Sequence, residues 1–498
     1  MIPVENVDSR QDGSMHRTLA VLAALALAVA ACSSEGSTAT RPRLPSAGRR
    51  EPTVHGAAGS ASGGDPYLPE SGNGGFDVTH YDITLAYGPS QPTIRATTTV
   101  DSVATEALAA FNLDFAGLTI DTITVDGRAA TYRRTGSELT VHPARTIRNG
   151  ARFRTAVTYH GIPHTVTDPS ESAPSAASQL GWSRDTEGRV YVVSEPIGAR
   201  TWFPGNDHPS DKATFDITVD VPTTVSVASN GALTRTPEPH GRERWHWTMA
   251  QPMATYLATV EIAPMREEDP PGPAGVTMRN FFPADTYDDA VKTFARTTAM
   301  IDYFTTLFGP YPFAQYGVVV VPHDLGYALE TQTMSVFGRD LLGTDPEAEA
   351  TVAHELSHQW FGDSVSLARW SDIWLNEGWA TYAEDLWHAH ADPSFDLNRF
   401  MIDLRAGQAG DLAAPQDPGV RGLFSPGVYQ RGALTLHALR RTVGDVTFFT
   451  IAKAWTTKYR YGTATTADFI ALSSSIAGRD LGPLFHAWLD DPTVPRLP

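Results

Sequence analysis

Two histidines and a glutamate lie within five residues of the sequence, in the segment His354-Glu355-Leu356-Ser357-His358. Residues at i and i+4 leave the same face of a helix, so both imidazoles can bind one metal ion. Glu355 lies beside them, where a base could reach a water on that metal. A catalytic zinc takes three protein ligands and leaves its fourth position for water. The segment therefore needs a third ligand from another element.

Glu377 supplies that ligand, with eighteen residues between it and His358, within an Asn-Glu-Gly-Trp-Ala segment. The alternative interpretation is an ordinary amphipathic helix with two partly buried histidines, which a glutamate in this context at this distance disfavours. The pattern resembles that of the gluzincin aminopeptidases, the family of aminopeptidase N and leukotriene hydrolase. The resemblance implies one zinc ion per chain, held by His354, His358 and Glu377, with Glu355 as the catalytic base.

Two further glutamates match segments that the family uses near the free amino terminus of its substrate. Glu195 lies in a Val-Ser-Glu-Pro segment that is similar to the family's Gln-x-Glu-Pro, and its alternative role is a surface ion pair at a strand end. Glu330 stands where the family has the glutamate of Gly-x-Met-Glu-Asn, on an edge strand bordering the cleft. The neighbours Tyr327, Leu329 and Thr331 replace the family's Gly, Met and Asn, which changes substrate-backbone contacts and the shape of the subsite.

The second half of the sequence contains two more candidate site residues. The segment around Tyr429 resembles the family's Tyr-x-Lys-Gly, with Arg431 in place of lysine. The resemblance implies that Tyr429 stabilises the oxyanion. Glu384 lies two turns beyond Glu377 on nearly the same helix face, so it could orient a ligand histidine from outside the metal's own ligand set. Its alternative interpretation is a solvated helix carboxylate.

The pattern of apolar residues predicts two domains. Residues 81–85, 94–100, 118–125, 153–159 and 215–221 alternate apolar and polar side chains, which is typical of strands with one buried face. Asp126-Gly127 and Asn230-Gly231 are turn signals. We therefore expect a mostly antiparallel β domain over residues 76–265, which resembles the family's saddle-like N-terminal domain. Residues 199–215 resemble a family signature there, with Gly205 in place of a cysteine.

Residues 266–498 are expected to form a mainly helical, thermolysin-like catalytic domain, which makes the fold α+β and multidomain. Helical spacing of apolar residues predicts one helix over residues 286–308. The metal-binding helix is predicted to begin near Asp345, an N-cap, with Pro346 in its first turn. Its partner is expected to run from about residue 372 to 387, through Glu377.

Composition restricts the class of partner and the compartment. The chain has 498 residues and a net charge of −18, which argues against a nucleic-acid partner because that would need a basic surface. Its single cysteine, Cys32, excludes an intramolecular disulfide. Cys32 follows thirteen apolar residues, 19–31, a length typical of a signal-peptide core and too short to span a bilayer.

The residues before Cys32 resemble a bacterial lipobox, in which cleavage exposes a thiol for lipid attachment. We therefore expect a signal peptide over residues 1–31, with Met1 or Met15 as the start, and a disordered Ser/Gly/Ala-rich tether over residues 32–75. The protein is then an extracytoplasmic lipoprotein anchored to the cell membrane. If Cys32 is incidental, the same segment is a plain secretory signal and the protein is secreted.

These residues together predict zinc-dependent hydrolysis of N-terminal residues from peptides with a free amino terminus. Two alternatives remain enzymes, an open-cleft zinc endopeptidase and an epoxide hydrolase like the leukotriene branch. A third belongs to another class, a non-catalytic zinc-stabilised lipoprotein that binds peptides, although such a protein needs neither Glu355 nor Tyr429. Larger family members continue into further domains with no counterpart in the sequence up to Pro498, so we expect a more open cleft.

The lipid anchor is tested by replacing one atom. Cys32→Ser is expected to release the protein from the membrane fraction or to block its processing, because the hydroxyl cannot replace the thiol in lipid attachment. Cell fractionation followed by immunoblotting measures this, with Ser34→Ala as the matched control. Unchanged membrane association of the Cys32 variant would show that another anchor exists.

Overall fold

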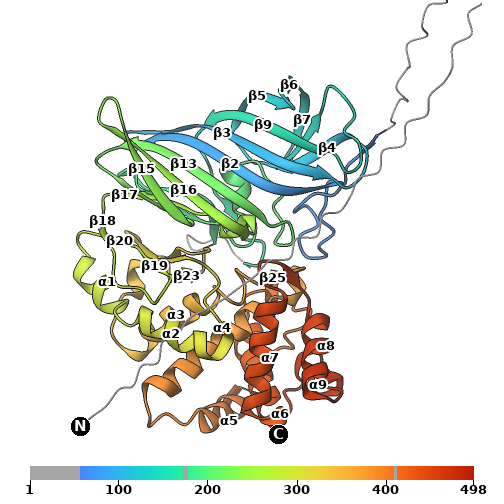
Figure 1. Ribbon diagram of the computed structural model, residues 1–498, viewed down its shortest axis with the longest axis vertical. Helices are drawn as coiled ribbons and strands as arrows, with labels where there is room; N and C mark the ends of the chain where they lie inside the picture. Colours follow the sequence, from blue (N-terminus) through green and yellow to red (C-terminus); the bar gives the residue numbers. More distant parts are fainter. Residues whose placement is uncertain (1–55, 172–177, 409–411) are drawn as a thin grey trace, which may run out of the picture. The chain divides into compact units, whose positions relative to one another are not determined.

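The computed structural model describes residues 56–171, 178–408 and 412–498. Strands fill the first half of this range and helices most of the second (Figure 1). The predicted order, a β domain followed by a mainly helical domain, is confirmed. The predicted signal peptide, Cys32 and both possible start residues lie outside the described residues. Within the described ranges, no helix is both long enough and apolar enough to cross a membrane.

The largest sheet of the β domain has eight strands, and the alternating segments of the sequence form its centre. Its order is β15 (Ala232–Glu238), β16 (Arg242–Met253), β13 (Ala213–Pro222), β2 (Phe76–Gly88), β3 (Gln91–Ala104), β9 (Arg152–Gly161), β5 (Thr119–Val125) and β6 (Arg128–Ala129). Tyr81, Ile83 and Leu85 of β2 are buried while the residues between them are exposed, as the period of two predicts. All neighbours are antiparallel except β13 and β2.

Two smaller sheets complete this domain. The five-stranded sheet has the order β10 (Val166–Thr167), β11 (Gln179–Arg184), β12 (Val190–Val193), β17 (Val260–Ala263) and β14 (Ser226–Ser229). The four-stranded sheet has the order β1 (Ala57–Ala58), β4 (Leu108–Asp114), β8 (Glu138–His142) and β7 (Thr131–Thr135). Glu195 follows β12 by two residues, so the five-stranded sheet positions one of the predicted amine-binding carboxylates.

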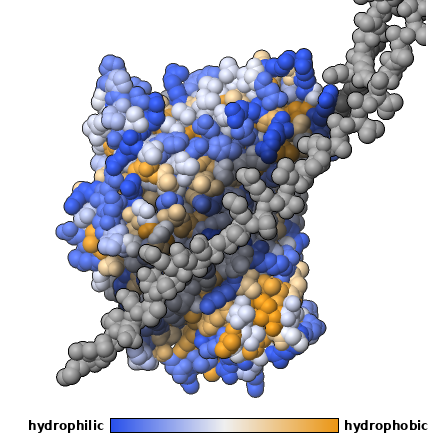
Figure 2. Space-filling model, viewed as in Figure 1, coloured by the Kyte–Doolittle hydropathy of each residue, from blue (hydrophilic) through white to orange (hydrophobic). Residues whose placement is uncertain are grey.

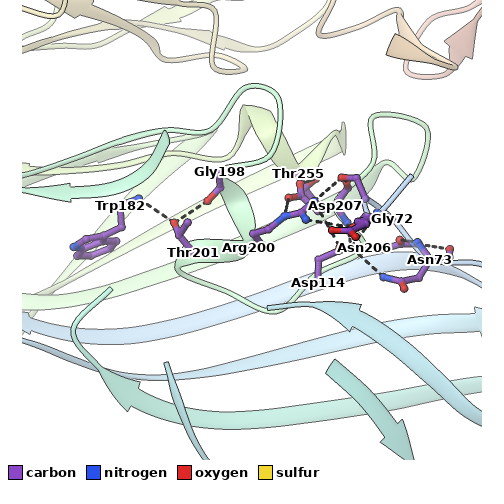
Figure 3. Close-up of polar contacts among 12 residues, drawn as sticks. Gly72, Asn73, Asp114, Trp182, Gly198, Arg200, Thr201, Asn206, Asp207 and Thr255 are labelled. Carbon is purple, nitrogen blue, oxygen red and sulfur yellow. Dashed lines mark hydrogen bonds and ion pairs between the residues drawn. The ribbon is translucent and has the colours of Figure 1, made fainter. Parts of the chain in front are cut away.

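The expectation that the tether extends to residue 75 is wrong for its last twenty residues. Residues 56–75 are described, and Asp65, Ser71 and Asn73 among them are buried. The carboxylate of Asp114 accepts hydrogen bonds from the backbone N–H of Gly72 at 3.1 Å and from Asn73 Nδ2 at 3.0 Å (Figure 3). Composition misses this order because hydrogen bonds to buried groups, rather than apolar burial, hold the segment.

Several of the residues that hydrogen-bond to residues 56–75 belong to the motif at residues 199–215. Arg200 is buried, and its Nε donates to Asp207 Oδ2 at 2.9 Å (Figure 3). Its guanidinium also donates to the hydroxyl of Ser71. The backbone N–H of Asp207 donates to Asp114 at 2.9 Å, which joins the motif to β4. The arginine and aspartate of the signature therefore attach the start of the described chain to the β domain.

The catalytic domain combines a five-stranded sheet with helices. The sheet order is β18 (Met265–Glu268), β20 (Asn280–Pro283), β22 (Val318–Val321), β24 (Ser335–Gly338) and β23 (Ala328–Leu329), and two short pairs join β19 (Thr277–Met278) to β21 (Gln315–Tyr316) and β25 (Ser366–Leu367) to β26 (Thr463–Ala464). The helices are α1 (Tyr287–Thr293), α2 (Thr297–Phe308), α3 (Pro346–Ser357), α4 (Trp374–Ala391), α5 (Leu397–Gln408), α6 (Gly432–Val443), α7 (Asp445–Lys458), α8 (Thr466–Ala477) and α9 (Gly482–Leu489). The predicted edge strand before Glu330 is β23.

The single helix predicted over residues 286–308 is divided into two helices, α1 and α2. The segment 286–308 is interrupted between α1 and α2, where the backbone N–H of Thr297 bonds the carbonyl of Phe294 three residues back. The Thr297 hydroxyl donates to the same carbonyl at 2.8 Å. Both bonds compete with the helical i to i−4 bond of that carbonyl. Gly309, with φ +98°, ends α2 where the sequence predicts a stop.

The surface and the core of the described chain differ in hydropathy. On the face that Figure 2 shows, hydrophilic residues cover most of the surface and hydrophobic residues gather in small patches. Apolar side chains are instead buried, among them the tryptophans 182, 202, 245, 247, 360, 370, 374, 379 and 455. This distribution is typical of a chain whose core is well covered.

Candidate active site

Helix α3 begins and ends where the metal motif requires. Asp345 caps it, because its Oδ1 accepts from the backbone N–H groups of Glu347 and Ala348 at 3.0 Å each. His358 follows the last helical residue but keeps helical dihedral angles, φ −56° and ψ −26°. The i, i+4 relation of His354 and His358 is therefore preserved, and both rings leave one face.

Helix α4 brings the third ligand to this face. Glu377 lies in its first turn, and its Oε2 is 3.2 Å from His354 Nε2 and 3.4 Å from His358 Nε2. A tetrahedral zinc with ligands at about 2.0–2.1 Å separates its ligand atoms by about 3.4 Å. The three ligand atoms lie within 4.8 Å of one another. The residues therefore fit a zinc ion without rearrangement.

The far side of each imidazole is held in place. Nδ1 of His358 lies 3.0 Å from the carbonyl oxygen of Phe361, which accepts its proton and leaves Nε2 free to bind a metal. Nδ1 of His354 contacts Glu384 Oε1 in the same way. Such partners orient metal-binding histidines and raise their basicity. Of the two interpretations of Glu384, the geometry supports the one in which it orients His354.

Charges around the site control its protonation. Burial raises the pKa of Glu377, but the facing His358 and His354 outweigh it and hold that pKa at about 2. Burial raises the pKa of Glu355 to about 8 against the lowering effect of the same histidines. A dication bound by the two imidazoles would lower the pKa of Glu355 towards neutral pH, where a general base works best.

Glu195 and Glu330 converge on the same place from different domains. Carboxylate oxygens of Glu195, Glu330 and Glu377 lie within 4.8 Å of one another. Glu330 is 3% exposed, and Oε1 of both Glu330 and Glu195 is buried without a hydrogen-bond partner among the described residues. Burial, followed by the charge of Glu330, raises the pKa of Glu195. The surface ion pair considered for Glu195 finds no lysine or arginine partner in the described ranges.

Tyr429 lies beside the metal ligand His354. It belongs to a π-helical turn, Gly427–Arg431, and its ring stacks on that of His354 at 6.0 Å between centroids and 15° between planes. Burial, followed by the charge of Glu377, raises the pKa of Tyr429 well above its ordinary value, so the hydroxyl remains a hydrogen-bond donor. Arg431 is buried and donates to the carbonyls of Trp488 and Asp491 at 2.8 and 2.6 Å, which holds this turn to the end of α9.

The sequence matches the Peptidase M1 N-terminal domain over residues 78–257 and the Peptidase family M1 domain over residues 292–488. It is also similar to the M1 zinc metallopeptidase of Deinococcus radiodurans, with 31% identity over 88% of this chain and 98% of that one, and a TM-score of 0.78. The chain belongs to peptidase family M1. A variant of the Deinococcus protein bound to the substrate Tyr-Ser-Ala superposes with a TM-score of 0.79 and 31% identity, covering 88% of this chain and 99% of that one.

Other M1 relatives are longer than this chain. Aminopeptidase N of Streptomyces lividans is 29% identical over 336 residues, which cover 61% of this chain and 38% of that protein. Leucyl aminopeptidase of Saccharolobus solfataricus is 26% identical over 330 residues, covering 62% of this chain and 42% of that protein. The match therefore spans about two fifths of the length of these curated relatives.

Residues that sequence reasoning did not assign to the site connect its parts in this M1 chain. Asn230 Nδ2 donates to the carbonyl of Gln332 at 2.8 Å, and the N–H of Gly231 donates to the hydroxyl of Thr333 at 2.8 Å. Gln359 Nε2 donates to the carbonyl of Glu330 at 3.2 Å. The Asn-Gly pair carries a sequence signal, since it predicts a turn, but the signal does not say what the turn contacts.

Lys212, in the signature of the β domain, contacts the segment that follows the metal helix. Its Nζ donates to the carbonyls of Asp363 and Ser364 at 2.7 and 3.1 Å. Burial lowers the pKa of Lys212 to about 7, although the neighbouring Asp363 raises it. The lysine thus joins the two domains next to the carbonyl of Phe361 that orients His358.

The departures from the family's Gly-x-Met-Glu-Asn segment have different consequences. Tyr327 and Leu329 line a pocket beside Glu195 and Tyr429. Thr331 is buried and its hydroxyl donates to the carbonyl of Met334, so it closes a turn. The two larger substitutions therefore reshape the pocket wall, while the third is structural.

Metal content tests the assignment of the ligands. The purified protein is expected to contain close to one zinc per chain, and His358→Ala is expected to lose it, because two remaining ligands cannot complete the site. Glu384→Gln is expected to lower zinc affinity about 10- to 100-fold through loss of the charged partner of His354. Elemental analysis and competition with a chelator measure both effects.

The matched control is Glu347→Gln, which removes an exposed carboxylate from the first turn of α3. It should bind zinc as the parent protein does. Full zinc retention by the His358 variant would contradict the ligand assignment, and unchanged affinity in the Glu384 variant would contradict its orienting role.

Proposed function

We propose that this protein is a zinc aminopeptidase, which hydrolyses the first peptide bond of peptides with a free amino terminus. The observation that carries the proposal is the pair Glu195 and Glu330, each with a buried oxygen that lacks a partner among the described residues. Such carboxylates cost free energy unless a cation joins them. An α-ammonium group is a cation that donates up to three hydrogen bonds and ends the chain at that point.

Register follows from the position of this pair. Glu195, Glu330 and Glu377 are close neighbours, so an ammonium bound by the first two lies within one residue of the metal ligands. The peptide bond nearest the metal site is then the first one. The curated and solved relatives support the proposal, since they are aminopeptidases and a zinc metallopeptidase that binds a tripeptide substrate.

Zinc held by His354, His358 and Glu377 would polarise the scissile carbonyl and lower the pKa of a water at the open position. Glu355 takes a proton from the attacking water and passes it to the leaving amine as the C–N bond breaks. Tyr429 donates a hydrogen bond to the substrate's carbonyl oxygen, where negative charge develops. The products are the free first amino acid and the shortened peptide.

We also propose that the enzyme acts outside the cytoplasm, attached to the membrane through a lipid on Cys32. The apolar segment 19–31 and the cysteine that follows it support this placement. Substrates would then be peptides present outside the cytoplasm. The fractionation of the Cys32 variant described above tests the attachment independently of activity.

The roles of the two catalytic residues are separable. Glu355→Gln is expected to retain zinc and bind substrate but to lose turnover, because it removes the base and no ligand. Tyr429→Phe is expected to lower kcat about 100- to 1,000-fold with little change in KM, as for the loss of one oxyanion donor. Steady-state kinetics on an aminoacyl-anilide, with and without chelator, measures both. A Tyr429 variant that mainly raised KM would be a binding variant.

Blocking the amino terminus tests the register. Acetylation of the substrate is expected to abolish most cleavage, because each charged hydrogen bond to the ammonium contributes about 1.5–3 kcal/mol. Glu330→Ala is expected to lose most activity on free peptides, whereas its effect on acetylated peptides should be small. Mass spectrometry of the products of matched free and acetylated peptides measures this. Internal cleavage of acetylated peptides at the rate of free ones would favour the endopeptidase alternative.

A further inference from the structure

A pocket opens beside the proposed amine site. Its volume is about 230 Å³, and both Glu195 and Tyr429 contribute to its wall. In the proposed function, on which this inference rests, Glu195 binds the ammonium and Tyr429 faces the carbonyl oxygen of the same residue. The side chain of that first residue leaves the carbon between these two groups, so this pocket receives it.

Apolar side chains form about half of the pocket wall. Leu180, Val193 and Leu329 are buried and line it, together with the partly buried rings of Tyr327 and Phe424. These groups come from β11, β12, the segment around β23 and the loop before Tyr429. A side chain that enters the pocket is therefore surrounded by hydrocarbon along its stem, which favours chains of several methylene groups.

The polar lining of the pocket, apart from the site itself, is acidic. Asp168 is 9% exposed, and its Oδ1 accepts a hydrogen bond from the backbone N–H of Ser170 at 2.7 Å. Glu171 also lines the pocket and is exposed. Neither carboxylate has an ion-pair partner among the described residues. Burial raises the pKa of Asp168, and the charge of Glu171 adds to this effect.

We infer that the pocket selects substrates whose first residue is basic, arginine or lysine, with Asp168 binding the cationic end of the side chain. Both side chains combine an apolar stem with a charged head, which matches a pocket lined by apolar side chains and by carboxylates. An acidic first residue would place its charge against Asp168, Glu171 and Glu195, so it is disfavoured. Uncharged long side chains can contact the apolar part of the wall but leave the Asp168 carboxylate without a cationic partner.

Substrate pairs that differ only in charge test this inference. The zinc-loaded enzyme is given arginyl and citrullyl 4-nitroanilides, since citrulline has nearly the shape of arginine without its charge, and lysyl, leucyl and glutamyl anilides extend the series. The ratio of kcat/KM for arginine over citrulline is expected to be roughly 10- to 100-fold. Asp168→Asn should bring this ratio close to one, because asparagine retains the bond to Ser170 and loses the charge.

The control variant is Asp302→Asn, which removes one exposed charge from α2 and should leave the ratio as it is in the parent enzyme. Hydrolysis of the leucyl anilide with equal rates on arginine and citrulline would overturn the inference while the proposed function stands. A ratio that survives in the Asp168 variant would likewise overturn the role of this residue.

A measurement of ligand binding tests the pocket independently of turnover. Calorimetry with the zinc-loaded Glu355→Gln variant compares L-arginine amide with L-citrulline amide. Tighter binding of the arginine amide that is lost when Asp168→Asn is added would support the pocket assignment. This holds even if no anilide is cleaved, in which case only the proposed hydrolysis fails. Equal binding of the two amides would overturn the inference.

Discussion

The site is built around buried negative charge that the protein's own cations do not neutralise. Glu195, Glu330, Glu355 and Glu377 lie together, and burial, followed by the charge of Glu330, raises the pKa of Glu195. In the described ranges, the basic side chains that face them are His354 and His358. Buried carboxylates in such numbers are unfavourable unless cations join them. A dication between the imidazoles and an ammonium between Glu195 and Glu330 are the two that this geometry accommodates.

This requirement explains why the two domains must be held together firmly. Glu195 follows a strand of the β domain, whereas Glu330 and the metal ligands belong to the catalytic domain. Their convergence depends on contacts that cross between the domains, namely Lys212 to the carbonyls of Asp363 and Ser364, and Asn230 to that of Gln332. A shift of one ångström at these contacts would separate the carboxylates and weaken their joint hold on a cation.

Local sequence patterns predicted the parts of the site that depend on local geometry. The spacing of His354 and His358, the cap at Asp345 and the alternating strands each express a period of one element, and the structure has them as expected. Contacts between distant segments leave no such period. The ordering of residues 56–75 rests on Asp114 and the motif at Arg200, and the division of the helix at Phe294 rests on how Thr297 bonds its neighbours. Neither can be read from spacing.

In the segment that ends at Glu330, the charged residue matches the family's motif, whereas the side chains before it differ from the motif in shape. Tyr327, Ala328 and Leu329 all line the pocket. Glu330 directs its carboxylate to the amine site instead. Recognition of the chain end and selection of the first side chain are thus carried by different atoms of one short segment. Substitution at the first two positions can change which side chain is accepted, while the charge that fixes the cleaved bond stays in place.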